Sequence, residues 1–275
     1  MEKNSTSDKE KGHFLETCYS FLLVGITGSG KSAVGNSLIG SNSFLSSSSS
    51  ISVTEDVVCK TATRYGTKIS VVDSPGVLDT KVDPDQAKRK SLDEMKKAMS
   101  VCPAAGKMAL ILVLQYGSRF TEQNRLAITI LKNIFGEQSL WRSCVVVVTH
   151  GDCFHSKYQG SKDFKDWTAE QTGGLGEVFE NCGNTCVLFD NDTDDSQHNE
   201  KQFRELVACV ERLDQSYTKI KFNEAKKSQN RIALEAELPK LKEEFMAELN
   251  GINNEIDLLA ISSQSLDKIE DLKFR

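Results

Sequence analysis

Residues 19–32 read YSFLLVGITGSGKS, and this stretch decides the fold. An apolar run of strand length ends in the motif G-x-x-x-x-G-K-[ST] at residues 25–32, and a helical pattern follows directly. Glycines let the backbone curl so that its N–H groups point at phosphate oxygens, and the helix that begins at Lys31 adds its positive dipole end. The stretch predicts a phosphate-binding loop, with a glycine-rich turn that binds nothing as the alternative.

Strand-like and helical segments alternate from this loop to about residue 217. The expected strands are residues 19–26, 57–65, 69–73, 108–114, 144–149 and 185–189. The expected helices are residues 31–39, a helix opened by Asp83 and Pro84, a helix opened by Thr121, and residues 163–180 and 197–217. This alternation predicts an α/β P-loop NTPase fold: a mostly parallel six-stranded sheet with helices on both faces, followed by a C-terminal α-helical extension.

Length and composition suit one globular domain with an extension. The chain has 275 residues, of which 39% are hydrophobic and 27% charged. We expect a disordered lead-in at residues 1–17, a nucleotide-binding domain at 18–215 and a helical or coiled-coil extension at 216–275. The formal net charge of -5 argues against a nucleic-acid partner, because no basic excess is present to neutralise phosphates.

Neither a secretory signal nor an apolar run of transmembrane length occurs in the sequence. We therefore expect a cytoplasmic protein, with peripheral membrane contact left open. The eight cysteines include Cys182 and Cys186, which flank a short turn, but no CxxC pair and no His/Cys metal spacing. Structural thiols are expected rather than a disulfide framework or a zinc site.

A second motif, DSPG at residues 73–76, ends the third expected strand. There Asp73 can bind Mg²⁺ through water, and Gly76 can turn its N–H onto a γ-phosphate and release it after hydrolysis. Asp, Pro and Gly also mark ordinary turns, so a turn without function is the alternative. The position of the motif, about 40 residues after Lys31 on the third strand, favours a nucleotide-sensing switch.

A third motif, THGD at residues 149–152, follows an apolar strand. A carboxylate at Asp152 can accept two hydrogen bonds from the N1–H and N2 amino edge of guanine, which adenine does not offer. Many GTPases carry Asn-Lys-x-Asp here, so the match is partial; His150 can stack on the base. A helix cap formed by Asp152 is the alternative.

Together these motifs resemble the GTPase of immunity-associated protein (GIMAP) family, which has an AIG-type guanine-nucleotide-binding domain, and more distantly the plastid-envelope Toc GTPases. The resemblance covers about residues 19–213. It rests on GITGSGKSAVGNSLIG, on DSPGVLDT at 73–80, on LVLQYGSRFTE at 112–122, on THGD and on FDN at 189–191. Segment 112–122 is the most specific, because ordinary Ras-like proteins lack this box.

The resemblance implies GTP or GDP with Mg²⁺ as cofactors, and a homodimer or a nucleotide-dependent oligomer. It implies that Asn191 contacts guanine and that Thr54 is the switch threonine, with Ser50 and Ser52 as competitors. Arg119 would stabilise transition-state charge across a dimer, although Ser118 is one extra residue before it; a solvated loop arginine is the alternative. The candidate cofactor-binding residues are Gly25, Thr27, Gly28, Ser29, Gly30, Lys31, Ser32, Ala33, His150, Asp152 and Asn191. The candidate metal-binding residues are Ser32, Thr54 and Asp73, and the candidate catalytic residues are Lys31, Thr54, Gly76 and Arg119.

Val77 stands where a glutamine would orient an attacking water. We therefore expect an enzyme that hydrolyses GTP to GDP slowly on its own and with partner assistance, and the family suggests immune or stress defence. Two alternatives stay open: a nucleotide-dependent oligomerising scaffold with little or no hydrolysis, and an ATPase.

Apolar side chains recur after residue 220 at steps of three and four residues. They are Leu234, Leu238, Leu241, Phe245, Leu249, Ile252, Ile256 and Leu259. From Leu238 onward the mean step is about 3.5 residues, which is the coiled-coil period. Pro239 is expected to mark a kink or a helix start. A helix folded back on the domain and a helix that pairs between chains are equal alternatives.

Overall fold

A six-stranded sheet with the order β2-β3-β1-β4-β5-β6 forms the centre of the computed structural model, which describes residues 18–45, 56–77 and 84–273. The strands are β1 (Cys18–Val24), β2 (Val58–Arg64), β3 (Thr67–Asp73), β4 (Lys107–Gln115), β5 (Cys144–Thr149) and β6 (Cys186–Leu188). Neighbouring strands run parallel, except that β2 pairs antiparallel with β3 at the edge. The expected mostly parallel six-stranded sheet is confirmed.

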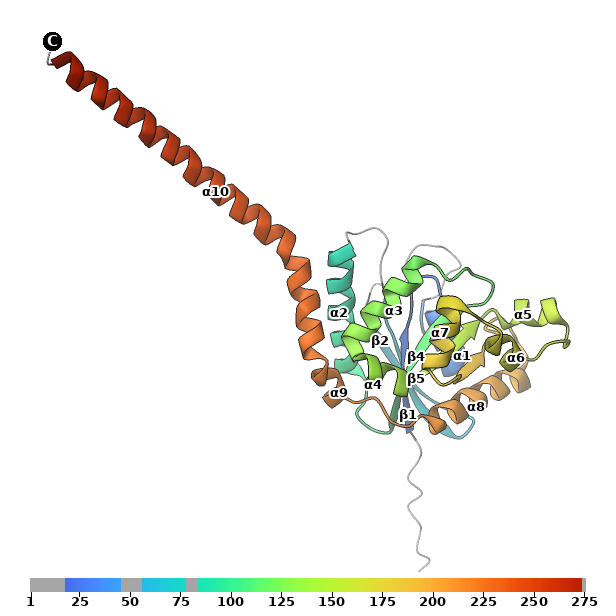
Figure 1. Ribbon diagram of the computed structural model, residues 1–275. Helices are drawn as coiled ribbons and strands as arrows, with labels where there is room; N and C mark the ends of the chain where they lie inside the picture. Colours follow the sequence, from blue (N-terminus) through green and yellow to red (C-terminus); the bar gives the residue numbers. More distant parts are fainter. Residues whose placement is uncertain (1–17, 46–55, 78–83, 274–275) are drawn as a thin grey trace, which may run out of the picture.

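Helices cover both faces of this sheet, as Figure 1 shows. They are α1 (Lys31–Ile39), α2 (Pro84–Val101), α3 (Glu122–Phe135), α4 (Glu137–Arg142), α5 (Gly151–Tyr158), α6 (Phe164–Ala169), α7 (Gly173–Asn181), α8 (Ser196–Arg212), α9 (Lys219–Glu224) and α10 (Lys226–Lys273). Successive residues of β1 serve different faces: Leu22 joins the cluster under α2 and α3, whereas Phe21 and Leu23 join the cluster under α1 and α8. Burial on both faces explains why the central strands are apolar throughout.

The single helix expected over residues 163–180 is wrong, because the chain forms α6 and α7 there. Gly173, the first residue of α7, has φ 62°, which a right-handed helix cannot continue through. Gly174 then lies against the ring of Phe120, where an added Cβ would be 2.6 Å from a ring carbon. The break therefore seats the start of α7 on the loop that follows β4.

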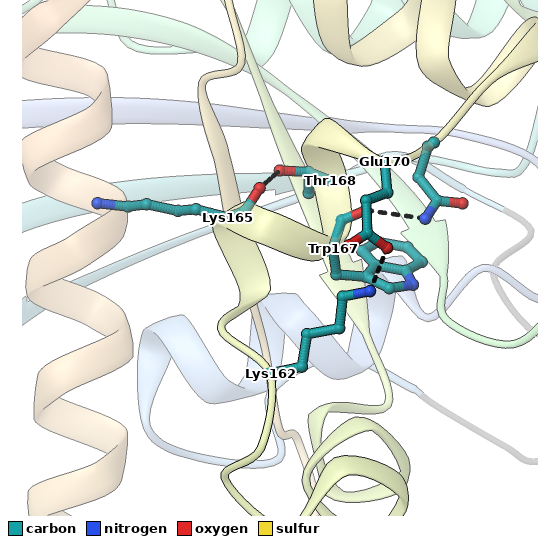
Figure 2. A network of polar contacts seen from close by, with 6 residues as sticks. Lys162, Lys165, Trp167, Thr168 and Glu170 are labelled. Atoms are coloured by element: carbon teal, nitrogen blue, oxygen red, sulfur yellow. Dashed lines mark hydrogen bonds and ion pairs between the residues drawn. The ribbon is translucent and has the colours of Figure 1, made fainter.

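Local polar contacts close α6 at both ends. The Asp163 carboxylate caps the helix by accepting a hydrogen bond from the backbone N–H of Lys165 over 2.8 Å. Figure 2 shows the ion pair between Lys162, which precedes α6, and Glu170, the C-cap residue of α6. On its inner side Trp167 packs edge-on against Phe154 of α5. These contacts fix α6 as a cover over α5.

The helix expected over residues 197–217 ends earlier, because α8 stops at Arg212. The ammonium of Lys107 binds the carbonyl of Glu211 at 2.9 Å, so a side chain from β4 occupies the helix end. The chain then runs back toward the sheet, where the Tyr217 N–H donates to the carbonyl of Met108 over 2.8 Å. Tyr217 is 1% exposed and belongs to the core.

The first turns of α10 are folded back on the domain, and the later turns project from it. Gln229 is buried and donates to the carbonyls of Ile134 at 2.8 Å and Phe222 at 2.9 Å, while Ile232 is 2% exposed. Beyond these residues α10 leaves the body beside α2, where Figure 1 shows a bend in the helix. Pro239 lies inside α10, so it does not mark a helix start. The domain boundary expected at residue 215 stays a prediction.

Among the helices in the described ranges, none combines the length and the apolar character needed to cross a bilayer.

Candidate functional site

The loop between β1 and α1 has the backbone shape that its glycines predict. Gly25, Gly28 and Gly30 have φ values of 148°, 81° and 93°, which residues with a Cβ rarely adopt. The loop also packs directly on β4, since an added Cβ at Gly25 would be 2.6 Å from the carbonyl oxygen of Val113. Glycine is therefore required at Gly25 both for its conformation and for space.

The start of α1 offers backbone N–H groups to an anion. Gly30 is the N-cap residue and makes no side-chain cap, and the first turn holds no acidic residue. The N–H groups of the first turn, which includes Ser32 and Ala33, have no partner within the helix. Together with the helix dipole they form a site for negative charge.

Lys31 places a buried cation beside this loop. Its ammonium donates to the carbonyls of Gly25 at 3.3 Å and Ile26 at 3.0 Å, and the residue is 6% exposed. Burial lowers the pKa of Lys31 to about 8, although the charges of Asp73 and Glu94 work in the opposite direction. A buried ammonium that is bonded to uncharged carbonyl oxygens is suited to exchange them for an anion.

Ser32 and Asp73 bring two further oxygens to the same place. The Ser32 hydroxyl donates to Asp73 Oδ2 over 2.6 Å, and Asp73 is 1% exposed at the end of β3. Next to it, the Ser74 hydroxyl donates to the carbonyl of Leu23 and ties the turn to β1. Hard oxygen atoms of this kind are the usual ligands of Mg²⁺. The described residues hold no cluster of three or more His, Cys, Asp or Glu that could bind a metal by itself.

The DSPG turn touches the phosphate-binding loop. The Val77 N–H donates to the carbonyl of Gly25 over 3.0 Å, and Ile26 and Val77 form an isolated parallel bridge. An added Cβ at Gly76 would be 2.3 Å from the Thr27 hydroxyl and 2.4 Å from the Thr27 nitrogen. Only glycine fits there, so the two motifs lie in direct contact.

The two motifs expected to read a base are also in contact. His150 has φ 62° and is the N-cap residue of α5, so Asp152 lies within the first turn and is exposed. The interpretation of Asp152 as the helix cap is therefore wrong. The Gly151 N–H donates to the carbonyl of Phe189 over 2.9 Å, and an added Cβ at Gly151 would be 3.0 Å from the nitrogen of Asp190.

Two side chains that the sequence analysis did not select hold the loop after β6. Gln202 of α8 accepts from the N–H of Asp190 at 3.0 Å and donates to its carbonyl at 3.1 Å. The Ser37 hydroxyl of α1 donates to the side-chain oxygen of Asn191 over 2.8 Å. In sequence, Gln202 looks like any polar residue of an amphipathic helix, and only contacts between distant segments reveal its role.

Thr149 joins the base motif to the phosphate-binding loop. Its hydroxyl lies 3.1 Å from the carbonyl oxygen of Ser29 and 3.3 Å from that of Leu114, and its methyl carbon would be 3.1 Å from a Cβ added at Gly30. The sequence held a signal for this residue, because Thr149 stands where many GTPases carry asparagine. Its contacts fix the distance between the two halves of the site.

Among the described residues, the candidate catalytic arginine does not join this set of contacts. Arg119 is exposed on the loop after β4, where the Ser118 hydroxyl donates to the carbonyl of Gln115 over 2.9 Å and closes a turn. Thr54 and its competitors, Ser50 and Ser52, lie outside the described residues.

The residues present fit a nucleotide with Mg²⁺. The hydroxyls of Thr27 and Ser29 are buried in the loop without a hydrogen-bond partner among the described atoms. Buried polar atoms are normally satisfied, so these two point to a polar ligand. A phosphate chain would meet the backbone N–H groups, Lys31 and these hydroxyls together, and Ser32 with Asp73 would face a metal bound to it.

This fold and this loop define a P-loop α/β protein. The AIG1 family model matches residues 19–241, and the chain belongs to that family. The expected resemblance to proteins with an AIG-type domain is thus confirmed.

Known proteins agree with this assignment. Immune-associated nucleotide-binding protein 4 of Arabidopsis thaliana is 32% identical over 220 residues, which cover 80% of this chain and 65% of the relative. The chain therefore spans just under two thirds of that relative's length. Toc33 of Arabidopsis thaliana in complex with GDP and Mg²⁺ has a TM-score of 0.50 at 17% identity, over 74% of this chain and 88% of Toc33. A dimerization-deficient Toc33 mutant gives 0.51 at 17% identity with the same coverage, and both show the shared fold.

Proposed function

We propose that the protein binds GTP and GDP together with Mg²⁺ and is a GTPase that hydrolyses GTP to GDP slowly by itself. The observation that carries the proposal is the buried Lys31 ammonium, which lies over the glycine loop beside the Ser32–Asp73 hydrogen bond. Membership of the AIG1 family supports it, as does the fold shared with Toc33, which was solved with GDP and Mg²⁺.

Each part of the loop has a role in this proposal. The N–H groups of residues 25–33 would bind the phosphate oxygens, and the Lys31 ammonium would exchange the carbonyls of Gly25 and Ile26 for the β- and γ-phosphates. Ser32 and Asp73 would hold Mg²⁺, Asp73 through water. The ion supplies positive charge that offsets the charge developing on the phosphates. Gly76 would direct its N–H at the γ-phosphate.

Guanine is the base we propose, read by Asp152 and Asn191. Asp152 is exposed in the first turn of α5, so its carboxylate is able to accept from two base donors. His150 stands beside it and is half-buried, and we propose that its ring stacks on the base. Contacts through Thr149 hold this half of the site at a fixed distance from the phosphates.

Hydrolysis requires a water molecule aligned with the γ-phosphate, and Val77 cannot orient one. It is fully buried, and its N–H is bonded to the carbonyl of Gly25. We therefore propose that two copies meet through their nucleotide faces and that Arg119 of one copy neutralises charge at the site of the other. Exposure of Arg119 in the single chain supports this role.

The buried Val77 also favours a second function, that of a scaffold whose oligomeric state follows the bound nucleotide without hydrolysis. Phosphate release measured against protein concentration separates the two functions, with Lys31→Ala as the control. A rate per molecule that rises with concentration supports the GTPase. A flat rate near zero, with GTP still bound, leaves the scaffold. Preference for ATP in a competition assay would remove the guanine assignment.

The projecting part of α10 is proposed to pair between copies as a coiled coil. The apolar side chains of this part are 40% to 68% exposed and recur every 3.5 residues on average; they are Leu238, Leu241, Phe245, Leu249, Ile252, Ile256 and Leu259. We further propose that the protein acts in the cytoplasm and in immune or stress defence. The name of its relatives, immune-associated nucleotide-binding proteins, supports the immune role.

A further inference from the structure

Two thiols meet where α7 ends and β6 begins. Cys182 is the C-cap residue of α7, Cys186 is the first residue of β6, and their Sγ atoms lie 3.9 Å apart. The turn between them contains Gly183 and Asn184 with φ values of 63° and 55°. These two left-handed residues reverse the chain and bring the cysteines to the same side.

Backbone bonds hold this turn in place. The Asn184 N–H donates to the carbonyl of Phe179 over 2.8 Å, and the Thr185 N–H donates to the carbonyl of Cys182 over 3.2 Å. On the other side Cys186 is paired with Val146 of the sheet. The helix end and the strand start are therefore both anchored, and the two thiols are held close together before any reaction.

The two thiols differ in their surroundings. Cys182 is 4% exposed, whereas Cys186 is half-buried. A hydrogen bond from the Cys186 thiol lowers the pKa of Cys182, and the same bond together with burial raises the pKa of Cys186. Between α6 and α7, a hollow of about 370 Å³ has Phe179 and Asn184 in its wall, and Asn184 belongs to the turn between the two cysteines.

We propose that Cys182 and Cys186 form a dithiol site for peroxide, at which two-electron oxidation joins the pair in an intramolecular disulfide. The Cys182 thiolate attacks one oxygen of hydrogen peroxide, the O–O bond breaks, and hydroxide leaves with Cys182 as a sulfenic acid. The Cys186 sulfur then attacks the Cys182 sulfur, the S–OH bond breaks, and water leaves with the Cys186 proton. In total, two thiols and one peroxide give one disulfide and two waters.

This site is separate from the proposed nucleotide site. Parallel strands β1, β4 and β5 end at the phosphate-binding loop and at Thr149, whereas the dithiol stands where β6 starts. The inference therefore does not depend on GTP binding.

The test uses the reduced, folded, full-length protein and limiting hydrogen peroxide. Tryptic peptide 166–201 contains Cys182 and Cys186 and no other cysteine. We expect this peptide to lose two hydrogen atoms, to resist alkylation and to recover both thiols with dithiothreitol. Exposed Cys153 is the internal control, since a hydrogen bond to Asp152 raises its pKa. The pair should react at least about tenfold faster than Cys153.

Single variants test the order of the two steps. Cys186→Ser should stop at the sulfenic acid, so dimedone should label Cys182, whereas Cys182→Ser should lose the fast reaction. Cys153→Ser should form the disulfide like the unchanged protein. The proposal is overturned if peptide 166–201 is still fully alkylated once Cys153 has oxidised, or if either thiol couples to a different cysteine. The unchanged protein gives this answer even if a variant fails to fold.

Discussion

The hydroxyl of Ser32 donates a hydrogen bond to Asp73 Oδ2 over 2.6 Å, which joins the first turn of α1 to the end of β3. These residues lie 41 positions apart and come from two different motifs. Their contact places both proposed Mg²⁺-binding groups at one point beside the Lys31 ammonium.

Ser32→Ala should weaken the binding of GTP and GDP mainly when Mg²⁺ is present. Loss of a hydroxyl ligand and of its bond to Asp73 is worth about 1–3 kcal/mol, so the dissociation constant should rise about 5- to 150-fold. Fluorescence titration with a labelled guanine nucleotide, with Mg²⁺ and then with EDTA, measures this. Ser100→Ala, the same change at an exposed position on α2, is the control. An equal loss with and without Mg²⁺ would contradict the metal role.

Nucleotide affinity should fall as pH rises through the pKa of Lys31. Burial lowers this pKa to about 8, and the phosphates bind the charged form. The advantage of the unchanged protein over Lys31→Ala should therefore shrink between about pH 7 and pH 9. Titrations of both proteins at each pH give the ratio of affinities, in which titration of the base itself cancels. A constant ratio would argue against the role of this ammonium.

Without nucleotide, the lowered pKa of Lys31 makes the stability of the fold rise with pH, whereas it makes nucleotide affinity fall. An unfolded lysine keeps its proton to about pH 10.5, whereas folded Lys31 releases it near pH 8. The unfolded chain then binds more protons, so the contribution of Lys31 to the free energy of unfolding rises with pH across that interval, by up to about 3 kcal/mol. Lys31→Met should be more stable than the unchanged protein at pH 7 in urea, and by less at pH 9.

Gly76→Ala should impair hydrolysis more than binding. The added Cβ would stand 2.4 Å from the backbone nitrogen of Thr27, which a flexible side chain cannot relieve, so the turn must move away from the phosphate-binding loop. We expect the phosphate release rate to fall at least about tenfold, with a loss of about 1–3 kcal/mol in stability. Gly251→Ala, at an open position in α10, should change neither rate nor fold.

Much of this arrangement follows from local sequence. The glycine spacing at residues 25–32 fixed the loop, and unbroken apolar runs marked the strands covered on both faces. The break between α6 and α7 was missed because the expected helix was continued through Gly173, whose φ is 62°. Helical spacing also gave no sign of the contact between Gly174 and Phe120, which is 54 positions away in the chain. Sequence periodicity contains no information about such contacts.

Three polar side chains that hold distant backbone or side-chain groups were also missed, because their contacts cannot be seen in the sequence. Gln202, Ser37 and Gln229 read as ordinary helical residues, and each gains its role from a backbone or side-chain group far away in sequence. For the helical extension, spacing left folding back on the domain and pairing between chains as equal alternatives, and in the structure its first part is buried in the core. Hydrophobic spacing identifies an apolar face but does not identify the surface that covers it.

Two truncations should behave differently. Ending the chain after Tyr217 removes Phe222 and Ile232 from the core and leaves the carbonyl of Ile134 without Gln229, so we expect a loss of several kcal/mol or no folding. Ending it after Leu241 keeps these contacts and should leave the melting temperature unchanged. If α10 pairs between copies, light scattering should show fewer chains per particle for the shorter protein than for the full chain. An unchanged number of chains per particle would exclude pairing through the projecting part.

At about 1.5 Å per residue, residues 241–273 of α10 extend about 50 Å beyond the body. If helices of this length pair between two copies, their relative orientation decides how far apart the two bodies lie. Side-by-side alignment with the same polarity would keep both bodies at one end, close enough for their nucleotide faces to meet. Antiparallel pairing would hold the bodies at opposite ends of the paired helices. The nucleotide face of each body could then meet only that of a further copy.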